Sequence, residues 1–378
     1  MVDAEIIHGR AILGQLQGDW ERLMEAGHHE PSVSFQWTAA LMESHVQSQD
    51  KITSIILRQN GRVVGIIPLV MRPVKMFGQS LMTACPVSEL SNTHSDLLLE
   101  EVSEPILGAF VEALSRLEQS WDVFNMTRIL ESSRLCKLLC ELARQRWKRL
   151  ECVRTPPSFV LTLDSTMDGY LRQRSGSFRN ALKRIERKLA SRGCLTIRTQ
   201  NDFSDIDEAY AVLLSIEHRS WKHIHGTSIS SVSRQATFYQ RLCQMAHQKN
   251  WLQLEFLYLD DRPVAYNLGL TLKDTYFYLK TSYDQAERPS SPATFLRARL
   301  VEGLIVRGVT RMDFPAEPYE WERQWTDELR WHQSLTLFAP TLKGVAYGFY
   351  RKVRAMQRRA DDLQVQYTNP RDLKAGHS

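Results

Sequence analysis

The chain has 378 residues, 43% of them hydrophobic and 24% charged, values typical of a globular protein that is long enough for two domains. It has no uninterrupted apolar run near the ~20 residues of a membrane span, no basic and apolar start of the kind that secretory signals have, and no Cys-x-x-Cys spacing among its six cysteines. A net charge of +5 is too small to indicate an anionic partner by itself. We therefore expect a cytoplasmic protein with free thiols.

A β-hairpin is the clearest element of the first half. Residues 52–58 and 63–71 are β-prone and are joined by Asn60-Gly61, a strong signal for a type I′ turn. A loop at 85–94, a helix at 104–119 and a strand at 121–126 are predicted next. The helix begins at Ser103-Glu104-Pro105, and the carboxylate at its start would repel a phosphate group.

Two consecutive prolines, Pro156 and Pro157, mark the boundary that we expect between two domains. A strand is predicted at 159–163, and helices at 167–173, 177–192, 203–220 and 232–248. We divide the chain into residues 1–155, residues 156–340 and a segment 341–378, in which a basic amphipathic helix precedes a polar tail.

The second half then repeats the layout of the first. Strands at 253–259 and 264–272 flank the turn at Asp260-Asp261, and an aromatic strand with period-two alternation follows at 275–283. A polar loop at 284–291 leads to a helix at 292–307, which begins at Pro292 behind Ser290 and Ser291 as possible caps. A last strand is predicted at 309–314. The repeated order indicates two similar domains rather than a solenoid.

These residues resemble the GNAT acyltransferases, in the branch that includes cellulose-biosynthesis-associated acetyltransferases and lies near the Fem-type aminoacyltransferases. The resemblance is carried by the aromatic strand, Ser291-Pro292-Ala293, Gly308 to Asp313-Phe314, and Tyr319-Glu320 ahead of Trp325. Ala293 replaces the usual glycine, and Glu320 stands where a lysine is common. The resemblance covers residues 155–340 well and the first half weakly. It implies an α/β (α+β) fold of two tandem GNAT-like domains, each a mixed, mostly antiparallel twisted sheet flanked by helices, with the first domain degenerate.

Acyl transfer from a thioester requires a site for the diphosphate of CoA, and a helix start is suited to it. We expect the diphosphate at the helix that begins at Pro292. The expected contacts are the backbone amides after Ser291, at Ala293, Thr294 and Phe295, with support from Arg288, Arg297 or Arg299. The resemblance implies that the strands at 275–283 and 309–314 part to hold the thioester of acetyl-CoA or a longer acyl-CoA, without a metal. An ordinary helix cap beside exposed arginines is the alternative interpretation.

Asp313 is the leading candidate for the general base, because it ends the last strand beside the expected acyl group. The alternative is an aspartate that caps the following turn. Glu317 is the next candidate, and Tyr283 is a candidate acid that returns a proton to the thiolate. Tyr319, Glu320 and Trp325 are candidates for the acceptor pocket.

The segment from Glu217 to His223 contains further candidates. Trp221 resembles a family tryptophan before the acceptor-binding region, and His218 or His223 could accept a proton because imidazole titrates near neutral pH. His218, His223 and His225 have no aspartate or cysteine partner at matching spacing, which disfavours a metal site.

The basic residues are concentrated in two predicted helices. Between Arg172 and Arg192 lie eight basic residues and one acid, and a second basic cluster lies at 351–359 beside Tyr347, Phe349 and Tyr350. A solvated helix face explains the first, and packing on the domain explains the second equally well. The functional alternative is contact with an anion, such as a CoA phosphate, an acidic polysaccharide or a membrane surface. Nucleic acid is not expected, because no aromatic residues are interleaved with the basic ones.

The sequence thus predicts an acyltransferase that moves acyl groups other than aminoacyl from CoA to an amine or hydroxyl of a cell-envelope sugar or lipid precursor, such as one used in exopolysaccharide synthesis. We expect a small-molecule or lipid acceptor and a cytoplasmic location, with peripheral contact to the inner membrane as an option. One alternative is long-chain N-acylation of a sphingoid-type amino alcohol. Another is a Fem-type enzyme that uses aminoacyl-tRNA, and a third is a non-catalytic binding module with the same fold.

Overall fold

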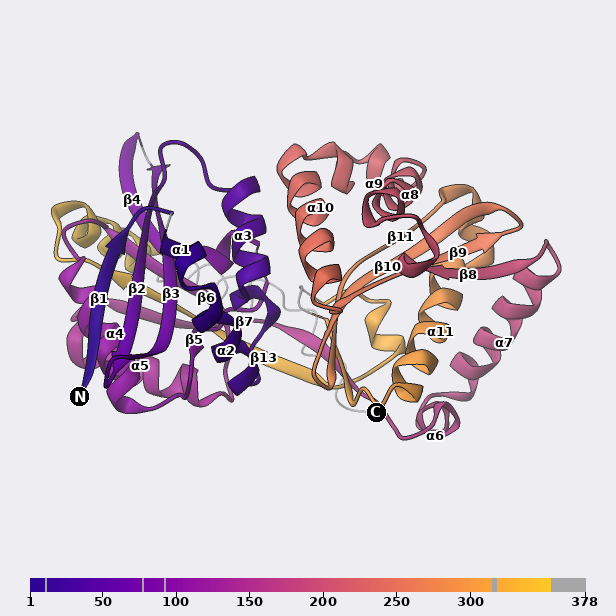
Figure 1. The fold of residues 1–378 in the computed structure, drawn as a ribbon, viewed down its shortest axis with the longest axis horizontal. Helices are drawn as coiled ribbons and strands as arrows, with labels where there is room; N and C mark the ends of the chain where they lie inside the picture. The colour runs from indigo at the N-terminus through magenta and orange to yellow at the C-terminus, as the bar shows by residue number, and fades with distance from the viewer. Residues whose placement is uncertain (11, 77, 92, 315–317, 355–378) are drawn as a thin grey trace, which may run out of the picture.

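The computed structural model describes all residues except 11, 77, 92, 315–317 and 355–378. Two lobes, formed by the first and second halves of the chain, lie side by side (Figure 1) and share one continuous 13-stranded sheet. Along the sheet the strand order is β1-β2-β3-β4-β6-β13-β7-β12-β11-β10-β9-β8, with the short β5 paired to β3.

The described residues of the first half form seven strands, of which the seventh also enters the second half. The strands are β1 (Val2–His8), β2 (Lys51–Gln59), β3 (Arg62–Met76), β4 (Gln79–Pro86), β5 (Leu98–Leu99), β6 (Val123–Leu130) and β7 (Leu150–Thr162). The helices are α1 (Ile12–Gln15), α2 (Gln17–Ala26), η1 (Pro31–Val33), α3 (Phe35–Ser44), η2 (Val87–Ser91), α4 (Glu104–Arg116) and α5 (Arg134–Arg146).

The second half has more helices before its sheet. The strands are β8 (Leu195–Thr199), β9 (Leu252–Leu259), β10 (Arg262–Leu272), β11 (Thr275–Tyr283), β12 (Arg311–Asp313) and β13 (Leu329–Phe338). The α-helices are α6 (Met167–Arg172), α7 (Gly176–Ala190), α8 (Ile206–His218), α9 (Trp221–Ile224), α10 (Ser233–Gln248) and α11 (Pro292–Val306). The 3₁₀ turns are η3 (Gln200–Asp202), η4 (Ile229–Ser231), η5 (Gln285–Ser290) and η6 (Glu322–Gln324).

Both halves have the same strand order, which confirms the predicted tandem GNAT-like fold. Strands β1-β2-β3-β4 are antiparallel neighbours, and β6 joins β4 in parallel after the crossover helix α4. Strands β8-β9-β10-β11 repeat this arrangement, and β12 joins β11 in parallel after the crossover helix α11. A parallel pair needs a long crossover, and a helix supplies it in each half.

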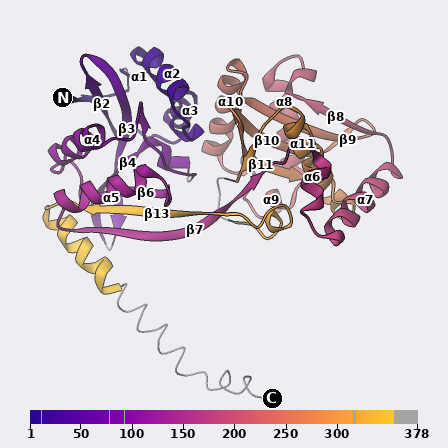
Figure 2. The same ribbon diagram turned by 90° about the horizontal axis from the view of Figure 1, so that it is seen from below.

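Two long strands connect the halves. β7 pairs with β13 over its first part and with β12 over its last three residues, and Figure 2 shows β7 and β13 running side by side between the lobes. Pro156 and Pro157 lie inside β7, so the strand that we expected to begin at residue 159 is the continuation of one that begins at Leu150. The division at residues 155 and 156 therefore falls within a strand and stays a prediction.

Local turn chemistry agrees with the backbone. Asn60 and Gly61 have φ of 52° and 80°, as a type I′ turn requires, so the predicted hairpin of β2 and β3 is confirmed. In the second hairpin β10 begins at Arg262, two residues earlier than predicted, and β12 is three residues long rather than six. The C-terminal helix is described over residues 342–354, and the rest of its predicted length lies outside the described residues.

Helices cover both faces of the sheet, and one apolar cluster joins the halves. Side chains of α2 and α3 share this cluster with side chains of α8 and α10, and Trp37 contacts Phe238 edge to face at 5.2 Å. Helices α4 and α5 cover the other face of the first half, and α7 and α11 cover the other face of the second. In the described parts of the chain, no helix combines the length and the apolar character needed to cross a membrane.

Candidate active site between the two halves

The strands β11 and β12 separate after three residue pairs. Thr275, Tyr276 and Phe277 pair with β12, whereas β11 continues for six more residues to Tyr283. The pairing of β11 with β10 jumps from Tyr278 to Lys280, which is the pattern of a β-bulge at Leu279. A bulge bends a strand and increases its twist. It lies just beyond the last parallel pair, and this gives a physical cause for the separation.

Helix α11 begins at Pro292, as predicted, but its cap differs from the prediction. Ser291 has φ of 53° and ψ of 49°, which is left-handed, and its side chain makes no capping hydrogen bond. Its carbonyl instead accepts from the amides of Thr294 and Phe295 at 3.1 and 3.3 Å. Two of the three amides predicted to face an anion are therefore already bonded. Residues other than Gly or Asn are strained in the left-handed conformation, and such strained residues cluster at functional sites.

The three arginines predicted near this helix start have different environments. Arg288 is exposed, and Arg299 pairs with Glu302 at 2.8 Å and with Glu186. Arg297 turns inward, is 4% exposed, and donates from Nε and from an Nη to the Tyr278 hydroxyl at 3.2 Å. Its guanidinium lies 3.7 Å from the centre of the Trp321 ring. Its contacts with these aromatic side chains stabilise the packing beneath α11.

Two cations from α7 and the residues just after it reach the loop before α11. Lys188 Nζ donates to the Pro289 carbonyl at 2.9 Å, and Arg192 donates to Ser290 Oγ at 3.0 Å. Arg192 also pairs with the buried Glu287. The basic helix predicted at 177–192 therefore ends at the start of α11, where positive charge would favour an anion.

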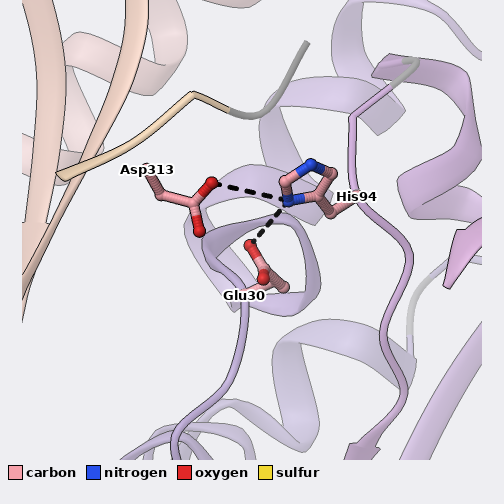
Figure 3. A group of neighbouring side chains, drawn as sticks. All are labelled: Glu30, His94 and Asp313. Atoms are coloured by element: carbon pink, nitrogen blue, oxygen red, sulfur yellow. Dashed lines mark ion pairs between the residues drawn. The ribbon is translucent and has the colours of Figure 1, made fainter. Parts of the chain in front are cut away.

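Asp313 ends β12 and lies in a buried group of charges from both halves. It is fully buried and forms an ion pair with Arg330 of β13, which also contacts Glu30 Oε1 at 3.2 Å. His94 of the first half lies between the carboxylates. Its Nδ1 is 3.6 Å from Glu30 Oε2 and 3.9 Å from Asp313 Oδ1. Figure 3 marks these two ion pairs with dashed lines.

The charges of this group are coupled. Burial by itself would raise the pKa of Glu30, but His94 and Arg330 outweigh burial and hold the pKa at about 2. Burial also lowers the pKa of His94, and Arg330 acts in the same direction. The ring of His332 stacks on His94 at 4.4 Å, and burial lowers the pKa of His332 to about 3. At neutral pH, Glu30 is thus expected to be ionised and the two imidazoles to be neutral.

Glu30, His94 and Asp313 have atoms close enough together to hold a metal ion. The guanidinium of Arg330, however, already contacts both carboxylates. A metal ion at the same place would face that fixed positive charge. The arrangement suits a proton-transfer site better than a metal site.

A cavity of about 510 Å³ opens beside this group, between the two halves. Its lining includes Glu30, His94, Thr275, Phe277, Arg311 and Arg330. Phe277 is paired with Asp313 across the last parallel pair of β11 and β12. The cavity therefore meets the sheet where the two strands separate, and it is large enough for a small ligand.

The other predicted catalytic residues lie elsewhere. Tyr283 is six residues beyond Phe277 on β11, about 20 Å along the strand, and packs near Phe295 of α11. The rings of His218, at the end of α8, and His223, in α9, lie 4.1 Å apart with their planes tilted by 49°. Because of its distance along β11, Tyr283 cannot contact the same atoms as Asp313. Glu317 lies outside the described residues.

The predicted acceptor-binding residues are not gathered at the cavity. Trp325 is 1% exposed and packs on Phe178 at 5.1 Å, so it belongs to the core. Tyr319 stacks on Trp321, and Glu320 is exposed on the same surface loop. Trp221 is 42% exposed at the start of α9.

Sequence reasoning missed Glu30, His94 and Arg330. Glu30 and His94 lie in loops of the first half, 283 and 219 residues before Asp313 in the chain. No local spacing connects them with β12 or β13. The one available signal was the repeat itself, because a second domain that packs against the first can contribute side chains to a shared site.

The comparisons with known proteins agree with the topology. Residues 176–323 match the family model described as an acetyltransferase (GNAT) domain, and a search of curated proteins found no match. Among solved structures, FemX aligns with a TM-score of 0.60 at 10% identity, over 91% of this chain and 99% of that one.

Two further structures align with a TM-score of 0.53. One is the C-terminal domain of a protein named as a lysylphosphatidylglycerol synthetase from Agrobacterium fabrum, at 11% identity over 89% of this chain and 95% of that one. The other is a protein of unknown function from Bacteroides thetaiotaomicron, at 10% identity over 88% and 100%. At these identities the likeness establishes the fold alone.

Proposed function

From the match of residues 176–323 to the acetyltransferase (GNAT) domain model, we propose that the protein transfers an acyl group from a CoA thioester to an amine or hydroxyl of an acceptor bound between its two halves. The observation that carries the proposal is the separation of β11 from β12 at a bulge, with α11 beginning at the far end of β11. A gap between two strands exposes backbone groups that can bind the amides of a pantetheine arm.

The proposed donor lies along the free part of β11. The diphosphate sits at the start of α11, where Ser291 and Ala293 are partly exposed and Lys188 and Arg192 lie nearby. From Tyr283 back to Phe277 the strand covers about 20 Å, a span suited to an extended pantetheine arm. The thioester then lies at the end of the parallel pair, beside Asp313 and the cavity.

The proposed acceptor enters through the cavity. Its lining mixes apolar side chains, among them Trp20, Leu272 and Phe277, with the charged groups Glu30, Arg311 and Arg330, so it suits an acceptor that has both a polar group and an apolar part. One structure with this fold is named for lysylphosphatidylglycerol, a lipid that carries an amino acid. We therefore propose a cell-envelope precursor with an amino sugar or an amino lipid group, such as one used in exopolysaccharide or lipid synthesis.

A lipid acceptor would require contact with a membrane. Helix α7 exposes most of its basic residues, and the helix at 342–354 carries Arg351, Lys352 and Arg354. We propose that these surfaces bind anionic lipid at the cytoplasmic face. Co-sedimentation with vesicles that contain phosphatidylglycerol, compared with neutral vesicles, tests this part of the proposal separately.

The experiment for the main proposal measures free CoA from the purified protein. Acetyl-CoA to palmitoyl-CoA are supplied as donors, with glucosamine, a sphingoid-type amino alcohol and lysine as acceptors, and lysyl-tRNA is supplied as an alternative donor. Acceptor-dependent release of CoA supports the proposal, and Asp313→Asn should lower the rate at least about tenfold. Transfer from lysyl-tRNA alone would refute a CoA donor.

A second candidate function is a binding module without catalysis. The specific observation in its favour is the bonded state of the Thr294 and Phe295 amides at a helix start that has Ala293 in place of glycine. Saturable binding of acyl-CoA without release of CoA for any acceptor would establish the module and exclude the enzyme.

A further inference from the structure

His94 reaches the site from the first half, by way of the loop that follows η2. It is 3% exposed and lines the cavity between the halves. In the described residues, its Nδ1 has only the long ion-pair contacts with Glu30 and Asp313, and its Nε2 has no hydrogen-bond partner. A buried ring nitrogen without a partner has lost its bond to water, and this loss is costly unless a ligand restores one.

The two carboxylates determine which nitrogen should carry the proton. Glu30 and Asp313 both lie on the side of Nδ1, and Figure 3 shows that both dashed lines end at that nitrogen. A hydrogen on Nδ1 is attracted by both carboxylates, so the neutral ring is expected to keep its lone pair on Nε2. An imidazole held by a carboxylate in this way is the arrangement that general bases use.

Burial and the neighbouring cations keep the His94 ring neutral, while Glu30 is ionised. Burial is the largest cause that lowers the pKa of His94, Arg330 and Arg128 lower it further, and Glu30 opposes them. Arg330 pairs with both Glu30 and Asp313. His332, stacked on His94, adds no charge at neutral pH because its own pKa is lowered to about 3. At neutral pH the imidazole can accept a proton, and the carboxylates can stabilise the cation that forms.

The position of His94 agrees with the proposed path of the donor. Asp313, 3.9 Å from its Nδ1, is paired with Phe277 where β11 and β12 separate. The thioester of the proposed function ends at this point, and the acceptor cavity is lined by His94 itself. The imidazole therefore lies between the two expected substrates.

We propose that His94, a residue of the first domain, is the general base of acyl transfer, with Glu30 and Asp313 holding its Nδ1–H; this inference rests on the proposed function. The acceptor nitrogen or oxygen attacks the thioester carbon and its proton passes to Nε2, so that a carbon–nitrogen or carbon–oxygen bond forms. The tetrahedral intermediate then collapses, the carbon–sulfur bond breaks, and the CoA thiolate takes the proton from the imidazolium.

This assignment changes the expected role of two parts of the chain. Asp313 becomes a residue that positions the base instead of being the base, because its carboxylate is fully buried against Arg330. The first domain, which we expected only to shape the cleft, supplies the group that accepts the proton. A single GNAT domain cut from this chain would lack that group.

The test compares wild type with His94→Gln, and uses His8→Gln as a matched control. His8 lies on β1 and bonds Thr53 Oγ1 at 3.0 Å, away from the cavity. Each protein is assayed from pH 5 to 9 with acetyl-CoA and the panel acceptor that the wild type uses, and the affinity for acetyl-CoA is measured by titration calorimetry. We expect His94→Gln to lower kcat by about 100-fold or more with little change in acetyl-CoA affinity, and to abolish the fall in kcat/KM at acid pH that protonation of the imidazole causes. His8→Gln should behave as wild type.

The outcomes separate the two proposals. If the wild type releases CoA and His94→Gln keeps that rate and pH profile, the role of His94 is overturned while the acyltransferase stands. If the wild type uses no acceptor, the proposed function fails and the role of His94 fails with it. Nitrogen NMR of labelled histidine gives a check that needs no turnover. A proton on Nε2 in place of Nδ1, or a charged ring at pH 7, would overturn the inference.

Discussion

Replacing Arg330 by methionine should destabilise the protein strongly, and by an amount that depends on pH. Arg330 pairs with Glu30 and with the fully buried Asp313. Removal of one partner of a buried ion pair leaves an uncompensated charge, which costs about 3–5 kcal/mol. Methionine fills a similar volume without the charge, so the loss reports electrostatics rather than a cavity.

The pH dependence follows from Glu30. A pKa of about 2 in the folded protein, against an ordinary value of 4.5, corresponds to about 3 kcal/mol of stability. Because the folded pKa is depressed, this stability is present above pH 4.5 and is lost as the pH falls towards 2. Without Arg330 the pKa of Glu30 is less depressed. The variant therefore loses less stability than wild type as the pH falls through this range.

Urea denaturation at pH 7 and pH 3 measures both effects. We expect the difference in unfolding free energy between wild type and Arg330→Met to shrink by about 1 kcal/mol from pH 7 to pH 3. Arg323→Met, at an exposed arginine that lies 3.9 Å from Glu320, should change stability by less than about 0.5 kcal/mol. A loss for Arg330→Met that is below 1 kcal/mol, or equal at both pH values, would refute the electrostatic account of this group.

Three further variants test the surroundings of the site. Gly269→Ala should destabilise the protein by about 1–3 kcal/mol and weaken acyl-CoA binding, because a Cβ there would lie 2.2 Å from Tyr276 Cζ and 2.6 Å from the Phe277 carbonyl; thermal melting and calorimetry measure both, and unchanged values would show that the bulge does not depend on this glycine. Ser291→Gly should raise the melting temperature or leave it unchanged, since glycine relieves the left-handed conformation, whereas Ser291→Val should lower it; the reverse order would mean that the helix start is not strained. Burial raises the pKa of Glu322 to about 7, so its ionisation costs stability as the pH rises from 4.5 to 7. The unfolding free energy of Glu322→Gln relative to wild type should therefore be about 1–3 kcal/mol more favourable at pH 8 than at pH 5. Equal differences at the two pH values in urea titrations would contradict this.

The sequence by itself determined the local elements and their repetition. The Asn60-Gly61 turn, the aromatic strand that became β11 and the proline that begins α11 depend on residues a few positions apart, so their patterns predict them well. The same local reasoning placed Asp313 at the end of a strand. It failed at the start of α11, where Ser291 adopts a left-handed conformation that serine rarely shows, and at Trp325, whose burial depends on Phe178 and α7.

Only the tertiary structure decided what surrounds Asp313. Glu30, His94 and Arg330 come from two loops and a strand that lie far apart in the chain, and they meet because β7 and β13 join the two halves into one sheet. Contacts of this kind depend on how two domains pack, and the period of a strand or helix carries no record of that packing. The repeat in the sequence could predict two similar domains, but only the packed pair brings an imidazole of the first domain to the open strands of the second.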